Sequence, residues 1–167
     1  MAIEKPLRIG LVLSQVPGYS ETFFNNKLRG LTEEGHTVYL FISVNRSAKY
    51  KQAKVIYGPV LSGNKSKKLY VSLLSLIKLT FTSPRVAIRY FKLERQTGST
   101  MSATLRRMII NSHILPHRLD WIHFGFATMG INREFVGKAI GAKVAVSLRG
   151  YDIYVYPVKH PGCYITL

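Results

Sequence analysis

The sequence is poor in acidic residues. Of 167 residues, 24 are Lys or Arg and only 8 are Asp or Glu, which gives a formal net charge of +16. The imbalance is concentrated in residues 46–118, where 15 basic residues stand against one acidic residue, Glu94. A field of this sign attracts polyanions, either an acidic lipid surface or a nucleic acid, and charge alone does not choose between them.

Cysteine and long apolar runs are also scarce. Cys163 is the only cysteine, so no internal disulfide can form, which suits a reducing compartment. The apolar run 9–13 is too short for the core of a secretory signal. The longest apolar stretch, 69–82, contains Lys78 and falls short of the roughly 20 residues that a membrane-spanning helix needs. We therefore expect a protein that is soluble or peripheral at a membrane.

Two common ligand-binding signatures are missing. The first strand–helix turn, residues 17–22, has the sequence PGYSET and not the G-x-G-x-x-G of dinucleotide-binding proteins. His113 and His117 are four residues apart, but Pro116 lies between them and no acidic or cysteine partner is near. The sequence therefore predicts no metal site.

Apolar strands alternate with amphipathic helices at both ends of the chain. The strands 7–14 and 36–43 flank a helix that begins after Ser20, and Gly35 ends this helix. The rhythm resumes with a strand at 121–124, a helix at 128–140 and a buried strand at 143–148. It predicts an α/β fold, with a Rossmann-like parallel sheet flanked by helices in a single domain over 1–167.

The middle of the chain, about 45–118, is predicted to be a basic helical insertion. Residues 44–65 have the composition of a loop with room for a short strand at 55–57, and helices are expected at 67–81, 84–95 and 102–112. Seven cations surround the apolar positions of these helices, namely Lys67, Lys68, Lys78, Arg85, Arg89, Lys92 and Arg95.

Such a basic amphipathic surface is typical of a helix at a membrane interface, and we expect these seven side chains to face an anionic membrane. The alternative is a solvated charged face over a core stripe. Nucleic-acid binding ranks lowest, because the aromatic residues lie mostly at core spacings and no recognition motif is present.

Three loops follow predicted strands, at 15–22, 123–130 and 149–156. Because parallel strands end at the same edge of a sheet, we expect these loops to form one wall of a pocket. The first loop opens a helix, whose free N–H groups suit an anion, although a plain turn with a Ser cap explains it equally well.

Three side chains in these loops have functional groups that can take part in binding or catalysis. His123 can act as acid, base or hydrogen-bond donor, or it can be a buried, satisfied core residue. Arg149 can clamp a phosphate or carboxylate. Asp152 can bond a sugar hydroxyl or cap the next helix, and the alternative for both is an ion pair between Arg149 and Asp152.

The chain resembles family 4 glycosyltransferases, especially bacterial enzymes of exopolysaccharide or lipopolysaccharide assembly. Three segments carry the resemblance, in the order and spacing of the N-terminal domain of those enzymes. They are SETFFNNKLRGLTEEGHTVYLF at 20–41, DWIHFGFATMG at 120–130 and AVSLRGYDI at 145–153.

The resemblance implies a GT-B architecture, in which two Rossmann-like domains face a cleft. The N-terminal domain holds the acceptor, often a lipid-linked saccharide at the inner face of the cytoplasmic membrane. The C-terminal domain holds the nucleotide-sugar donor, and transfer retains anomeric configuration without a metal. We therefore expect a cytoplasmic protein that is peripheral at the membrane, and we expect that this N-terminal domain binds no cofactor. No donor-domain motif occurs in the 167 residues, so we expect this chain alone not to transfer sugar.

The resemblance also assigns roles to residues. It places His123, Arg149 and Asp152 at the catalytic end of the cleft. The expected substrate-binding residues are Gly18, Tyr19, Ser20, Glu21, Thr22, Phe124, Gly125, Gly150 and Tyr151. One departure stands out: many relatives have His where this chain has Arg149. A permanently charged Arg cannot do acid–base work but can stabilise phosphate or hydroxyl groups, which leaves His123 as the candidate for proton transfer.

Overall fold

The computed structural model describes residues 5–18, 22–43, 50 and 53–165. Its centre is a sheet of five parallel strands in the order β3-β2-β1-β4-β5. The strands are β1 (Arg8–Leu13), β2 (Thr37–Ile42), β3 (Lys54–Tyr57), β4 (Trp121–Phe124) and β5 (Lys143–Val146). The prediction of an α/β fold with a Rossmann-like parallel sheet is confirmed. Strand order reverses between β1 and β4, which is where open parallel sheets form a crevice for ligands.

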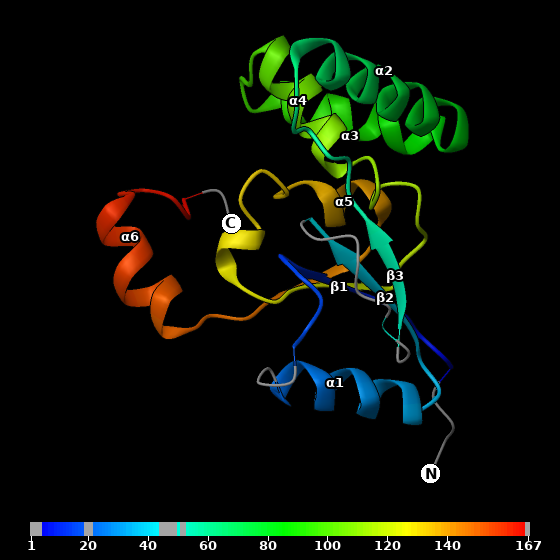
Figure 1. The fold of residues 1–167 in the computed structure, drawn as a ribbon, viewed down its shortest axis with the longest axis vertical. Coiled ribbons are helices and arrows are strands. Elements are labelled where there is room, and N and C mark those ends of the chain that lie inside the picture. Colours follow the sequence, from blue (N-terminus) through cyan, green and yellow to red (C-terminus); the bar gives the residue numbers. More distant parts are fainter. Residues whose placement is uncertain (1–4, 19–21, 44–49, 51–52, 166–167) are drawn as a thin grey trace.

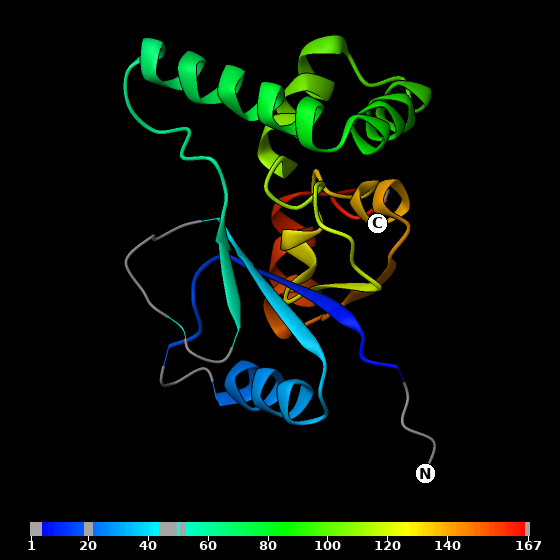
Figure 2. The ribbon, with the colours of Figure 1, turned by 90° about the vertical axis from the view of Figure 1, so that its right-hand side faces the viewer.

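Helices cover both faces of the sheet (Figure 1). Helix α1 (Thr22–Glu33) lies under one face. The other face carries four helices, α2 (Lys65–Thr82), α3 (Pro84–Gln96), α4 (Met101–Asn111) and the short α5 (Val136–Ile140). Both views place α2, α3 and α4 together at one end of the long axis and α1 at the other (Figures 1 and 2).

The alternation of side chains along β1 explains the two layers. Leu11 and Leu13 point toward α1, where they form a core with Phe24 and Leu28. Val12 points the other way, into the core beneath α2–α5. From Ile9 to Leu13 the strand is thus buried on both faces, as parallel strands usually are.

Local signals set the ends of the helices. Asn64 caps α2, because its Oδ1 accepts the backbone N–H of Lys67 at 3.0 Å. Pro84 begins α3 directly after Ser83, and α2 and α3 meet there at a bend of 116°. Gly35 and Gly141 have φ angles of 84° and 77° where α1 and α5 end, as predicted for C-terminal glycines.

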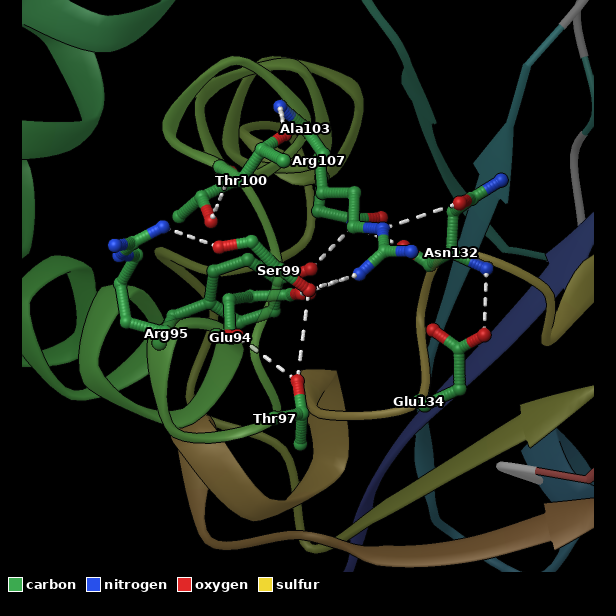
Figure 3. Close-up of polar contacts among 12 residues, drawn as sticks. Glu94, Arg95, Thr97, Ser99, Thr100, Ala103, Arg107, Asn132 and Glu134 are labelled. Carbon is green, nitrogen blue, oxygen red and sulfur yellow. Dashed lines mark hydrogen bonds and ion pairs between the residues drawn. The ribbon is translucent and has the colours of Figure 1, made fainter.

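A buried ion pair joins α3 to α4 (Figure 3). Glu94 is 0% exposed, and its Oε2 lies 2.6 Å from Nη1 of Arg107. The same guanidinium donates through Nε to Oδ1 of Asn132 at 3.1 Å. Arg107 therefore connects the helical layer to the loop that follows β4.

Three predictions of local structure are wrong. Residues 128–140 do not form one helix: a 3₁₀ turn, η1 (Ala127–Met129), is followed by a loop and only then by α5. Asn132 has a φ of 63°, which no helical residue adopts, and its carbonyl accepts Nδ2 of Asn111 at 2.8 Å, while the N–H of Val136 donates to the carbonyl of Arg133. Tertiary contacts thus override a helix-compatible sequence.

The C-terminal part of the chain also differs from the predictions. The segment 149–156, predicted to be a loop, contains a π-helical turn, η2 (Tyr151–Val155), that continues into α6 (Tyr156–Lys159). The strand predicted to be buried at 143–148 is β5, which lies at the sheet edge with Val144 47% and Val146 38% exposed. In the basic insertion, by contrast, the short strand expected at 55–57 is present as β3, which pairs with β2.

Candidate functional site

The carboxyl-terminal ends of β1, β4 and β5 lie side by side at the same end of the sheet, next to the beginning of α1. An open pocket of about 500 Å³ lies there, lined by Phe23, Ser147, Leu148 and Arg149. Phe23 belongs to α1, whereas the other three residues follow β5. Loops that are more than 120 residues apart in sequence therefore meet at one place, as the parallel sheet predicts.

A line of three polar side chains leads from α1 into this pocket. Nζ of Lys27 lies 2.8 Å from Nδ1 of His123, and Nε2 of His123 lies 2.8 Å from Oγ of Ser147. His123 is only 8% exposed, because β4 places it between α1 and β5. Both ring nitrogens are thus satisfied within the protein.

The protonation of His123 follows from its surroundings. Burial, reinforced by the charge of Lys27, lowers the pKa of His123 to about 4, so its ring is neutral at pH 7. An ammonium group has only donors, so Nδ1 accepts from Lys27 and Nε2 carries the ring proton. Nε2 then donates to Ser147, whose own hydroxyl proton stays available to a ligand in the pocket.

Arg149 lies over three aromatic rings. Its guanidinium carbon is 5.0 Å from the ring centre of Phe23, 4.7 Å from that of Phe24 and 4.9 Å from that of Phe126. Such packing holds a cation in place without neutralising it. Within the described part of the chain, no carboxylate pairs with this guanidinium, so the predicted alternative of an Arg149–Asp152 ion pair is wrong.

Asp152 bonds to backbone groups instead. It is 1% exposed, and its carboxylate accepts the N–H of Arg149 at 3.2 Å and the N–H of Thr128 at 3.3 Å. The carboxylate thus ties the turn after β5 to the turn after β4. This geometry makes Asp152 a positioning residue for Arg149, and its direct contact with a substrate stays a prediction.

The substitution Asp152→Ala is expected to lower the free energy of unfolding by about 1–3 kcal/mol, because two partly buried N–H groups lose their acceptor. Urea denaturation measures the change. Asp152→Asn keeps one carbonyl acceptor and is expected to lose about half as much. Equal stability of the Ala variant and the native chain would show that these two bonds do not hold the turns together.

The other predicted site residues fall in different places. Gly125, Gly150 and Tyr151 lie in the two turns beside the pocket, and Thr22 begins α1. Gly18 is exposed, and its carbonyl accepts Nδ2 of Asn25 at 2.9 Å. Tyr19, Ser20 and Glu21 lie outside the described residues.

Phe124 and Gly125 act through packing. The Phe124 side chain is 1% exposed and belongs to the core under the helical layer, on the face of β4 opposite to His123. A Cβ atom on Gly125 would lie 2.2 Å from Cδ2 of Leu13 and 3.0 Å from Cζ of Phe24, so a side chain here would displace these two core side chains. The glycine therefore leaves room for the core beneath α1.

Two residues at the site were missed by sequence analysis, Lys27 and Ser147. Lys27 follows Phe24 by three positions and precedes Leu28, so a cation occupies the apolar face of α1. Ser147 is a polar residue that directly follows an apolar strand. Each is a weak signal alone, since a lysine stem often covers apolar surface and a serine often ends a strand.

Comparison with known proteins leaves the family open. Among the described residues, no group of three or more His, Cys, Asp or Glu side chains is placed to hold a metal ion. No family model matches the sequence, and a search of curated proteins gives no match.

Proposed function

We propose that this chain is the acceptor-binding domain of a retaining glycosyltransferase that transfers a sugar from a nucleotide sugar to a saccharide. The observation that carries the proposal is the polar line Lys27–His123–Ser147, which ends beside Arg149 in one pocket. The function rests on this site and not on the fold, because Rossmann-like sheets serve many chemistries.

The pocket suits a saccharide. Sugar hydroxyls need directional partners, and the proton of Ser147 and the N–H groups of Arg149 are both available at the pocket wall. Phe23 is 55% exposed there and offers an aromatic face to the C–H groups of a sugar ring. The mixture of one apolar wall and a few fixed polar groups favours a neutral or weakly acidic carbohydrate.

The positions of the resembling segments also support the proposal. The segment 20–41 contributes α1, the segment 120–130 contributes His123, and the segment 145–153 contributes Ser147 and Arg149. Their meeting at one end of the sheet agrees with the resemblance to family 4 glycosyltransferases, which implies that these loops line the cleft.

Each residue has a distinct role in the proposed site. Neutral His123 polarises Ser147, whose hydroxyl positions the acceptor oxygen. Arg149 keeps its charge at every physiological pH, so it stabilises phosphate or hydroxyl oxygens and transfers no proton. The nucleotide-sugar donor would bind a second domain across the cleft, in a cytoplasmic protein at the inner face of the membrane.

Saccharide binding by this chain tests the proposal. Saturation-transfer NMR against a panel of oligosaccharides, with and without a polyprenyl phosphate tail, is expected to detect binding. Arg149→Ala and Ser147→Ala are expected to weaken it roughly tenfold, because each removes a hydrogen bond to the ligand. Arg29→Ala removes an exposed cation from the other end of α1 and serves as the matched control.

Two results would refute this function. One is that no saccharide in the panel binds. The other is that binding occurs but is equally strong in Arg149→Ala, Ser147→Ala and the Arg29→Ala control. Circular dichroism of each variant separates a lost contact from a lost fold.

A further inference from the structure

Helix α2 is apolar on two opposite faces. Its inward face contains buried Leu79 and partly buried Leu76, which pack on the core of the helical layer. On the other side, Tyr70, Leu74 and Phe81 follow the i, i+4, i+11 spacing of a single helical stripe. The exposed set, which we call the outer ridge, consists of Leu69, Tyr70, Leu73, Leu74, Ile77 and Phe81.

The outer ridge is far more exposed than scattered surface residues require. Exposed fractions run from 44% for Ile77 to 83% for Phe81 along this one helix. Contiguous apolar surface of this kind marks an interaction site in a water-soluble domain. A helix that only covered the sheet would carry polar residues on this side.

Exposed cations lie on the same helix as the outer ridge and on the helix that follows it. Lys67 and Lys78 are exposed on α2 itself. On α3, a row of exposed cations consists of Arg85, Arg89, Lys92 and Arg95. Glu94 is the only acidic residue in 46–118, and it is buried against Arg107, so nothing on these two helices neutralises the row.

The position of α2 and α3 leaves this surface accessible. They lie at one end of the long axis, away from α1 (Figures 1 and 2). No single helix among the described residues is long and apolar enough to cross a membrane, whereas α2 and α3 together are, by length and composition, but with the 116° bend between them. A bent pair with one apolar and one cationic outer surface suits the boundary between water and lipid.

We propose that the outer ridge of α2 inserts into an anionic lipid surface, with the cations of α3 on the lipid phosphates. Amphipathic helices of this composition bury their apolar side in the headgroup region and gain affinity from each nearby cation. A second copy of the chain would place the two cationic rows against each other. Nucleic acid would leave the aliphatic side chains of the ridge without a partner. This inference does not depend on glycosyl transfer.

Vesicle co-sedimentation of the 167-residue chain tests the proposal. Binding is expected to vesicles of phosphatidylcholine mixed with phosphatidylglycerol and to be weak with phosphatidylcholine alone. The variant Arg85→Gln/Arg89→Gln/Lys92→Gln is expected to lose roughly fivefold in affinity for each cation. Its matched control, Lys138→Gln/Lys143→Gln/Lys159→Gln, removes the same charge from exposed positions outside α2 and α3 and is expected to bind nearly as the native chain.

A second pair of variants tests insertion. Leu74→Ser/Phe81→Ser is expected to bind at least tenfold more weakly and to become fully sensitive to salt, because only electrostatic attraction remains. Its control, Val158→Ser/Ile165→Ser, removes two exposed apolar side chains near the C-terminus. All four ridge and control positions are exposed, so thermal unfolding should stay unchanged.

Several outcomes would overturn the proposal. Equal losses in the two charge variants would show that net charge acts without a defined surface. Native-like vesicle binding by the ridge variant would show that the ridge stays out of the lipid. A native dimer that the ridge variant dissociates would assign the ridge to a second copy, and RNA binding that exceeds vesicle binding would assign the cations to nucleic acid.

Discussion

Replacing Arg107 with Met is expected to lower the free energy of unfolding by about 3–5 kcal/mol, one of the two largest effects that the structure predicts. Glu94 is 0% exposed and depends on Nη1 of Arg107 at 2.6 Å (Figure 3). Without the guanidinium, Glu94 loses its shortest contact and keeps the neighbouring Tyr90 hydroxyl and the long contact to Oγ of Ser99 at 3.5 Å. A buried carboxylate with so little compensation is costly to keep ionised.

The mechanism can be separated from a general packing defect. Adding Glu94→Gln should recover part of the lost stability. Arg106→Met alters the exposed neighbour on α4 and serves as the control. Urea denaturation measures all four proteins, and similar losses for the two Arg variants would refute a specific role of the ion pair.

The sequence predicts those parts of the fold that depend on local signals. Gly35 and Pro84 mark where helices end and begin, and the apolar runs around Leu11 and Leu40 identify strands buried on both faces. These features act within a few residues of where they stand, so a single sequence reveals them.

The wrong predictions concern segments whose conformation or position depends on residues far away in the sequence. The loop around Asn132 has a helix-compatible sequence, but Arg107 and Asn111 of α4 hold its side chain and its carbonyl in another conformation. Val144 lies in an apolar run that is typical of a central strand, yet β5 is at the sheet edge. Strand order and long-range hydrogen bonds cannot be read from the local pattern of apolar and polar residues.

The candidate site was predicted in position but not in its contacts. Parallel strands bring His123 and Arg149 to one edge, and that topology follows from the strand–helix rhythm. The partners of His123 do not follow, because Lys27 and Ser147 lie 96 and 24 residues away in sequence. The stacking of Arg149 on Phe24 and Phe126 likewise needs the packed structure.

The second large effect is a loss of stability in acid. Two histidines have depressed pKa values in the folded chain: His113 at about 3, mainly because it is buried and also because of Arg133, and His123 at about 4, mainly because it is buried and also because of Lys27. The ring of His113 lies against Phe41, and among the described residues neither of its nitrogens has a hydrogen-bond partner in good geometry. Both rings therefore resist protonation while the chain is folded.

The sign of the effect follows from proton binding. Unfolded histidine takes up a proton near pH 6.5, whereas these two do so only near pH 3 and 4 when folded. Between those values the unfolded chain binds more protons, so stability falls as pH falls. From about pH 7 to pH 5, each histidine should contribute a loss on the order of 2 kcal/mol.

Urea denaturation across this pH range tests the assignment. His113→Leu should be as stable as the native chain at pH 7 and should lose about 2 kcal/mol less on going to pH 5, because its imidazole no longer has to be protonated on unfolding. His160→Gln is the control, since His160 is exposed beyond the end of α6. If His113→Leu and the native chain fell equally in acid, His113 would have to be hydrated or already charged in the folded chain. The core beneath α4 would then be open to water at His113, although this ring lies against Phe41 and Gly58.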